Sequence, residues 1–262
     1  MSIAPATRVA MVWAPRALVR VGVAPLRAEA DDAAELVDQA QYGELVTRLA
    51  DRGEWTYVQG PDLYFGWIRT EALAPYRTPD AVLVGVPLAP VHAKPSRDAD
   101  IVDELPAGVP LVSRTPAGNE WWRIGSEDRY AHRDDTVPVT TLPQRYPTPE
   151  DLLATAESYL GVPYLWGGTS ARGIDCSGLT QQVYRLNGVG LDRDADQQAL
   201  GGRPVDVARP GDLFFFGTDR VTHTAIATGE RTFIHAPQSG KSVQRGELTA
   251  TSPLRATRRY LP

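Results

Sequence analysis

Three side chains in the second half of the chain are of the types that carry out nucleophilic catalysis. Cys176 is the only cysteine, and two of the four histidines, His223 and His235, follow it in the sequence. A cysteine thiolate is a strong nucleophile, and it needs a neighbouring base to take its proton. A lone cysteine is ordinarily a small buried apolar side chain, so the case for chemistry depends on the elements that surround it.

The sequence predicts that Cys176 lies at the beginning of a helix. A glycine-rich turn precedes it, and Leu179, Val183 and Leu186 then recur with helical spacing. Gly188 is expected to end the helix. The N-terminus of a helix carries a partial positive charge, which favours a thiolate over a thiol. We therefore expect a lowered pKa for this cysteine.

The two histidines lie in two β-like segments that a turn joins. The segments are residues 221–227 and 232–236. With a loop over residues 228–230, His223 and His235 lie directly opposite each other on one face, and a two-residue loop would shift that register by one. In the favoured register His223 can act as the base for the cysteine while His235 holds its ring. The ordinary alternative for each histidine is a polar residue of a half-buried strand.

The first half of the chain has the pattern of two copies of a small β module. Short apolar runs alternate with clusters of Gly, Pro and Asp, as in small all-β domains. Residues 23–28 resemble residues 88–93, and residues 54–58 resemble residues 120–124, so the pattern repeats after about 65 residues. The alternative is a single irregular β domain.

Both copies resemble bacterial SH3-like barrels. Phe65-Gly66-Trp67-Ile68 looks like the closing strand of such a barrel, whereas Tyr130-Ala131-His132 departs from that pattern in the second copy. A proline-rich linker, residues 137–149, then leads to a helix. Thr148 is expected to cap this helix and Gly161 to end it.

The ordered motifs of the second half resemble those of the NlpC family of papain-like cell-wall peptidases. The motifs are Tyr164-Leu165-Trp166-Gly167-Gly168, Asp175-Cys176-Ser177-Gly178, Arg209-Pro210-Gly211-Asp212-Leu213, His223-Thr224-Ala225-Ile226 and Ile234-His235-Ala236. The resemblance covers residues 148–262 and implies an α+β papain-like domain with a triad of Cys176, His223 and His235. It also implies hydrolysis of the bond between γ-D-Glu and a diamino acid, either meso-diaminopimelate or L-Lys.

Taken together, these features predict a lead of residues 1–16, SH3-like barrels at 17–80 and 81–142, and an NlpC-type catalytic domain at 143–262. This order resembles that of the γ-D-glutamyl-L-diamino-acid endopeptidases that recycle wall peptides. In that subgroup the first barrel closes one end of the cleft. The resemblance therefore implies a preference for peptides with a free N-terminal L-Ala over stems that are still linked to sugar.

The same resemblance implies which residues bind the substrate. Asp194 matches an acidic position that binds the free ammonium group, although a solvated loop acid is the ordinary alternative. The contacts expected from the first barrel are Tyr64 and, as a weaker candidate, Glu35. Residues expected to line the pocket near the nucleophile are Tyr164, Trp166, Asp175 and Ser177. Tyr164 is also a candidate oxyanion donor beside the backbone N–H of the cysteine. Ala195 stands where the family often has Ser.

The amino-acid composition limits the classes of molecule that the protein is expected to bind. The net charge of -5 and the pI of about 5.4 argue against a nucleic-acid partner. No apolar run is long enough for a membrane helix, and one cysteine with four scattered histidines does not suggest a zinc site. The implied chemistry needs no cofactor. We expect a monomer that binds a wall-derived peptide in the cytoplasm, or a secreted protein if a leader has been removed.

Two other functions are compatible with parts of this pattern. The same Cys–His pair can pass an acyl group to an amine or alcohol instead of water, which would make the protein an acyl transferase. The β modules could also serve a wall-binding protein without catalysis. The presence of one cysteine and two histidines of the expected types argues against a wall-binding protein without catalysis.

Overall fold

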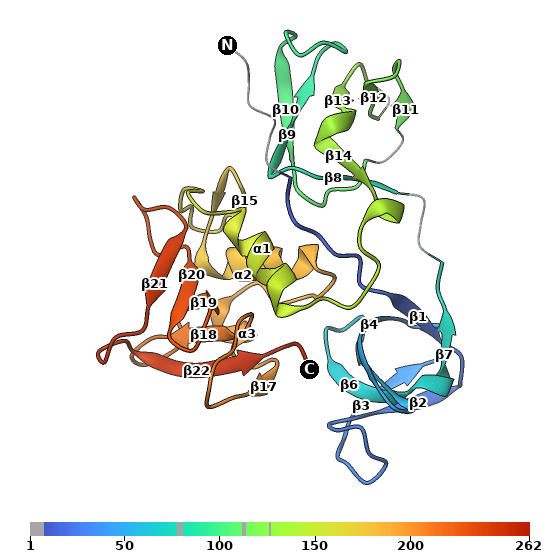
Figure 1. Cartoon of the computed structure of the whole chain (residues 1–262), viewed down its shortest axis with the longest axis vertical. Coiled ribbons are helices and arrows are strands. Elements are labelled where there is room, and N and C mark those ends of the chain that lie inside the picture. Colours follow the sequence, from blue (N-terminus) through green and yellow to red (C-terminus); the bar gives the residue numbers. More distant parts are fainter. Residues whose placement is uncertain (1–7, 78–80, 112–113, 126) are drawn as a thin grey trace.

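The computed structural model describes residues 8–77, 81–111, 114–125 and 127–262. Residues 1–7 of the predicted lead and residues 78–80 of the first predicted barrel therefore lie outside the described part. Figure 1 shows two β modules and a larger region that mixes strands and helices. The described part of the chain is mostly sheet, with few helices.

The first module is one antiparallel sheet of seven strands in the order β3-β2-β6-β5-β4-β1-β7. Its elements are β1 (Arg16–Val19), β2 (Val23–Arg27), β3 (Leu36–Gln41), β4 (Leu45–Arg52), β5 (Trp55–Gln59), β6 (Phe65–Arg69), the 3₁₀ turn η1 (Thr70–Ala72) and β7 (Leu73–Pro75). Alternate residues of the strands point inward, and Val19, Leu26, Val46 and Ile68 form a dry core of their own.

The second module has a five-stranded sheet in the order β10-β9-β13-β12-β11 and a separate pair, β14-β8. Its elements are β8 (Val82–Val84), β9 (Leu88–His92), β10 (Ile101–Pro106), β11 (Thr115–Pro116), β12 (Trp121–Arg123), β13 (Tyr130–His132), η2 (Arg133–Asp135) and β14 (Thr136–Pro138), with η3 (Val139–Thr141) after it. The sequence repeat falls on matching strands, because its two similar segments form β2 and β5 in one module and β9 and β12 in the other.

The third region contains the helices and a six-stranded sheet in the order β17-β22-β18-β19-β20-β21. Its elements are α1 (Pro149–Glu157), β15 (Thr169–Ser170), β16 (Gly173–Ile174), α2 (Cys176–Leu186), α3 (Ala195–Gln198), β17 (Arg203–Pro204), β18 (Leu213–Phe216), β19 (His223–Ala227), β20 (Thr232–His235), β21 (Gln244–Glu247) and β22 (Leu254–Arg259).

Both faces of this sheet are covered by apolar side chains. Phe215 and Ile226 pack with Leu179 of α2 in the largest core, on the side where Figure 1 shows α1 and α2. Phe214 and Phe216 point to the other face and form a second cluster. The unbroken apolar run of β18 is explained by this burial on two sides, which fixes β18 and its neighbour β19 beside α2.

The two helix starts predicted from the sequence are confirmed. Thr148 and Asp151 form a capping box at α1, and α2 begins at Cys176. The predicted end of α1 at Gly161 is wrong, because the helix ends at Glu157 and turns follow. Helix α2 ends at Leu186, and Gly188 then adopts a φ of 81°, as expected for a residue that terminates a helix.

The predicted register of the histidine hairpin is wrong by two positions. Ile226 pairs with Ile234 and Ala227 with Phe233, so His223 and His235 are not directly opposite each other. The turn is centred one residue later than expected, because the backbone N–H of Thr228 donates to the carbonyl of Thr232. Side chains of a strand alternate with a period of two, so a shift of two keeps both histidines on one face as diagonal neighbours.

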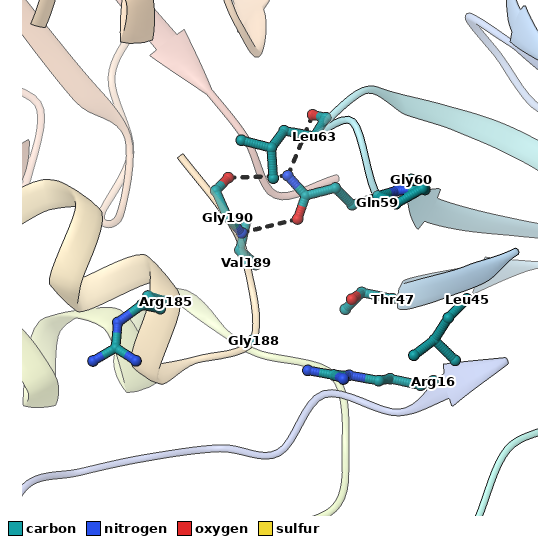
Figure 2. A pocket seen from close by; sticks show the side chains of 11 residues that line it. Arg16, Leu45, Thr47, Gln59, Gly60, Leu63, Arg185, Gly188, Val189 and Gly190 are labelled. Atoms are coloured by element: carbon teal, nitrogen blue, oxygen red, sulfur yellow. Dashed lines mark hydrogen bonds between the residues drawn. The ribbon is translucent and has the colours of Figure 1, made fainter. Parts of the chain in front are cut away.

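The first module docks on the third region, which contains the helices and the six-stranded sheet, through the backbone of Gly190, as Figure 2 shows. The Gln59 side chain donates to the Gly190 carbonyl and accepts from its N–H, both at 2.9 Å. Leu63 lies so close that a Cβ at Gly190 would meet its side chain at 2.5 Å. A cavity of about 260 Å³ lies beside this contact and contains none of the candidate catalytic residues.

The second module and the lead hold α2 from other sides. Arg185 of α2 donates to the carbonyl of Ala107 at 3.0 Å, and Arg172 pairs with Glu104 at 2.9 Å. The extended lead contributes the N–H of Val12, which donates to the carbonyl at the last residue of α2. The second module and the lead thus both contact the helix that begins with the cysteine.

Candidate active site

The nucleophile candidate occupies the first position of α2. Cys176 is 8% exposed and makes no disulfide. Asp175 is the N-cap, and its side chain accepts from the backbone N–H of Gly178 at 2.7 Å. The first N–H groups of a helix have no partner within the helix, so those of Cys176 and Ser177 are available around the sulfur.

The pKa of the Cys176 thiol is shifted in the opposite direction from the one expected from the sequence. Burial raises the pKa of the Cys176 thiol, and the negative charge of Asp175 adds to this effect. The backbone N–H groups of Thr224, Ser177 and Cys176 itself lower the pKa, as a helix start should, but burial outweighs them. The predicted lowering of the pKa is therefore wrong for the resting enzyme, which holds a protonated thiol that needs a base.

The base candidate comes from β19, which packs against α2. The Thr224 N–H that acts on the sulfur of Cys176 belongs to the residue directly after His223, so the start of this strand runs beside the nucleophile candidate. Nε2 of His223 lies 2.9 Å from Nδ1 of His235. Nδ1 of His223 takes no part in this contact and is the ring nitrogen available to accept a proton.

This geometry assigns the tautomers that catalysis requires. A base must offer a lone pair, so Nδ1 of His223 is unprotonated and its proton sits on Nε2. Nε2–H then donates to Nδ1 of His235. Burial lowers the pKa of both histidines to about 4, and the neighbouring His235 lowers that of His223 further. Both rings are therefore neutral near pH 7, and His223 can accept the thiol proton.

A cleft of about 480 Å³ opens in front of the nucleophile. Its lining residues come from four segments around the sulfur, and they are Trp166, Gly167, Asp175, Cys176, Ser177, Arg193, Asp194, Ala195, Asp196, Arg220, Val221 and Thr222. Four predicted substrate-binding residues, Trp166, Asp175, Ser177 and Asp194, thus lie on the same cleft as the cysteine. Trp166 is 80% exposed at its rim.

The carboxylate of Asp175 is occupied by structural partners. It accepts from the N–H of Gly167 at 2.8 Å and from both terminal nitrogens of Arg193, at 2.7 Å and 3.1 Å. Arg193 also donates to the hydroxyl of Ser177 at 2.9 Å. Asp175 therefore positions the cap, the glycine turn and the arginine. The sequence analysis missed Arg193, although it directly precedes Asp194.

Asp194 and Tyr164 differ in their surroundings. Asp194 is the N-cap of the short helix α3 and is exposed to solvent on the cleft. Tyr164 is half-buried and not among the lining residues, but it lies close enough to Cys176 and Asp175 for their charges to raise its pKa, after the larger effect of burial. Tyr164 is thus near the nucleophile, as the sequence predicted.

The two residues predicted from the first module do not line the cleft. Tyr64 is 51% exposed in the loop between β5 and β6, next to the Leu63 contact with Gly190. Glu35 is exposed just before β3, in the hairpin that Figure 1 shows pointing away from the catalytic region. Neither residue is among those that line the cleft, so their contact with the substrate stays a prediction.

Two further observations concern metals and membranes. Among the described residues, no group of three or more His, Cys, Asp or Glu side chains is arranged to hold a metal ion. Likewise, none of the helices in the described ranges is long and apolar enough to cross a membrane.

Comparison with known proteins places these features in two families of domains. Residues 161–259 match the NlpC/P60 family, and residues 26–73 match the bacterial dipeptidyl-peptidase Sh3 domain. A gamma-D-glutamyl-L-lysine dipeptidyl-peptidase of Bacillus subtilis (strain 168) is 32% identical over 232 residues, which cover 81% of this chain and 76% of the relative. Dipeptidyl-peptidase 6 of Lysinibacillus sphaericus is 30% identical, over 91% of this chain and 93% of the relative.

A solved structure supports the same assignment. The crystal structure of an NlpC/P60 family protein from Bacillus cereus ATCC 10987 is similar to this chain with a TM-score of 0.59 and 26% identity. The similarity covers 94% of this chain and all of the other chain. It therefore extends over the β modules as well as the catalytic region.

Proposed function

Because the chain belongs to the NlpC/P60 family of cysteine peptidases, we propose that it hydrolyses the bond between γ-D-Glu and the diamino acid of bacterial cell-wall peptides. The diamino acid is meso-diaminopimelate or L-Lys. The observation that carries the proposal is the placement of Cys176 at a helix start beside β19, with the 2.9 Å contact from His223 to His235 behind it. The names of the relatives support the choice of bond.

The reaction follows from the protonation states. Nδ1 of His223 takes the thiol proton as the sulfur of Cys176 attacks the γ-carbonyl carbon. The free N–H groups at the start of α2, with Tyr164 as a second candidate donor, stabilise the oxyanion. The imidazolium then gives its proton to the leaving amine of the diamino acid, and a thioester forms. Water attacks the thioester after His223 removes its proton, which releases the γ-carboxyl group and the thiol.

His235 acts through His223. When the His223 ring becomes an imidazolium, its Nε2–H still donates to Nδ1 of His235, so the ring keeps its orientation through the cycle. A second positive charge on His235 would oppose the imidazolium, and the low pKa of about 4 keeps His235 neutral. Asp175 and Arg193 hold the glycine turn and Ser177 around the reacting sulfur.

We also propose that the enzyme requires a free N-terminal L-Ala. Asp194 offers an exposed carboxylate on the cleft, and the segment before it is held by Gln59 of the first module. A substrate ammonium paired with Asp194 keeps its charge at low cost, whereas a blocked N-terminus leaves that carboxylate unpaired. Tyr64 lies in the docking loop and would act by limiting the length of the cleft.

The remaining assignments are proposals on the same basis. We propose that both β modules are SH3-like barrels, with limits near 17–80 and 81–142, because the second repeats the strand order of the first at matching positions. The catalytic domain then spans 143–262. A demand for a free amine suits peptides already released from the wall, so we place the enzyme in the cytoplasm as a monomer.

Mass spectrometry of two parallel digests tests the proposal. One contains L-Ala-γ-D-Glu-meso-diaminopimelate with a free amine, and the other contains the same peptide linked to N-acetylmuramic acid. We expect cleavage of the free peptide alone, abolished by Cys176→Ala. Equal cleavage of both would remove the free-amine requirement and leave the peptidase. Cleavage of neither would contradict the proposed function.

A further inference from the structure

An arginine side chain at the rim of the cleft has no role in the proposed reaction. Arg220 lines the cleft with Cys176 and is exposed to solvent. Among the residues that the structure describes, no carboxylate lies within ion-pair distance of Arg220. Arg193, the other arginine of the cleft, differs because Asp175 neutralises it at 2.7 Å.

The backbone that carries Arg220 is fixed. The N–H of Thr222 donates to the carbonyl of Phe216 at 2.9 Å, which closes the loop between β18 and β19. The N–H of Gly217 donates to the carbonyl of Pro253, also at 2.9 Å. A Cβ at Gly217 would lie 1.8 Å from the Arg220 carbonyl oxygen, so only glycine permits this tight loop. The backbone position from which the Arg220 side chain extends is therefore fixed.

The position of Arg220 relative to the base indicates which part of the substrate it meets. His223 must protonate the leaving amine, so its ring faces the leaving-group side of the scissile bond. Arg220 lies in the loop that leads into β19, three positions before His223, and lines the cleft together with Val221 and Thr222 of that loop. The acids Asp194 and Asp196 reach the cleft from a different segment, at the start of α3. This separation of the acids from Arg220 favours a position of Arg220 beside the diamino acid that leaves.

The two candidate diamino acids differ in charge at this point. The side chain of meso-diaminopimelate ends in an ammonium and a carboxylate, whereas that of L-Lys ends in an ammonium alone. A guanidinium binds a carboxylate through charge-assisted hydrogen bonds and repels a lone ammonium. We propose that Arg220 is a specificity-determining residue that binds the side-chain carboxylate of meso-diaminopimelate and makes the enzyme prefer it over L-Lys. This inference rests on the proposed function.

The test compares kcat/KM on three tetrapeptides with a free N-terminus, L-Ala-γ-D-Glu-X-D-Ala. X is meso-diaminopimelate, meso-diaminopimelate with its side-chain carboxyl amidated, or L-Lys. The D-Ala removes the free α-carboxylate of X from all three, so only the side chain differs. The enzymes are the wild type, Arg220→Gln, Arg220→Glu and, as a matched control, Arg209→Gln, which changes an exposed arginine away from the cleft.

We expect the wild type to prefer the diaminopimelate peptide about tenfold over the other two, which corresponds to one charge-assisted contact. Arg220→Gln should remove that preference without slowing cleavage of the L-Lys peptide, and Arg220→Glu should reverse it. Added salt should weaken the preference of the wild type alone. The control should behave as the wild type.

Three results would overturn the inference. They are a wild type that does not distinguish the peptides, an Arg220→Gln enzyme that loses equal activity on all three, and an Arg220→Gln enzyme that keeps the full preference. Failure of the wild type to cleave any of the peptides is a different outcome, because it refutes the proposed function itself.

Discussion

Removal of the Asp175 carboxylate should destabilise the catalytic domain and at the same time make the cysteine more acidic. The carboxylate is only 9% exposed, caps α2, and accepts from Gly167 and from both terminal nitrogens of Arg193. It also raises the pKa of the Cys176 thiol through its charge. One substitution therefore acts on stability and on reactivity in opposite directions.

The size of the stability loss can be worked from these contacts. Loss of an N-cap costs about 1 kcal/mol. Loss of the bonds to the Gly167 N–H and to Arg193 adds about 1–2 kcal/mol, a value reduced because the Arg193 side chain is 33% exposed. Asp175→Ala should thus lower the free energy of unfolding by about 2–3 kcal/mol. Asp175→Asn keeps one acceptor oxygen and should lose less.

The reactivity of the Cys176 thiol, by contrast, should increase. Without the negative charge, and with Arg193 no longer neutralised, the pKa of the thiol should fall. The rate of alkylation by iodoacetamide would then rise at a lower pH in Asp175→Asn than in the wild type. Asp194→Asn is the matched control, because it removes the charge of an exposed N-cap carboxylate at a four-residue helix on the same cleft.

Urea unfolding followed by circular dichroism, together with the pH profile of alkylation, measures both effects. The reasoning is refuted if Asp175→Ala is as stable as Asp194→Asn. It is equally refuted if alkylation of Asp175→Asn begins at a higher pH than in the wild type, since the carboxylate would then favour the thiolate.

Three further predictions follow from the same geometry. His235→Ala should lower kcat about 100-fold with little change in KM, because His223 loses the acceptor that orients its ring; an unchanged kcat in peptide digests would contradict this. Burial lowers the pKa of His223 and His235 from 6.5 to about 4, so the unfolded chain binds more protons between these pH values. Stability should therefore fall as the pH drops through that window, by at most about 1.4 kcal/mol per pH unit for each histidine; urea midpoints should show a smaller slope in His235→Gln. Gln59→Ala should destabilise the docked first module by about 1–3 kcal/mol, because the N–H and carbonyl of Gly190 lose their partners; an unchanged urea midpoint would show that this contact contributes nothing.

The sequence was sufficient for the elements that depend on local chemistry. The start of α2 at Cys176 could be predicted from the helical spacing of Leu179 and Val183, and the capping box of α1 from Thr148 and its acidic partner. The face shared by His223 and His235 was also predictable, because side-chain alternation survives any even shift in register.

Features that depend on tertiary packing were not predictable. The register of the histidine hairpin depends on the hydrogen bond from Thr228 to Thr232, which centres the turn on Glu230 instead of Gly229. The raised pKa of Cys176 comes from burial under neighbouring elements, which local helix chemistry does not report. Arg193 shows the same limit, since the partner of an arginine is fixed only in the folded chain.

The central claim is that Cys176 forms a thioester with the γ-D-Glu carbonyl after His223 takes its proton. Acid quenching of the enzyme during turnover of L-Ala-γ-D-Glu-meso-diaminopimelate, followed by intact-protein and peptide mass spectrometry, tests it directly. The account predicts a dipeptidyl adduct on Cys176 that hydroxylamine removes, which is absent in Cys176→Ala and strongly reduced in His223→Gln. Turnover by Cys176→Ala, or an adduct on another residue, would contradict it.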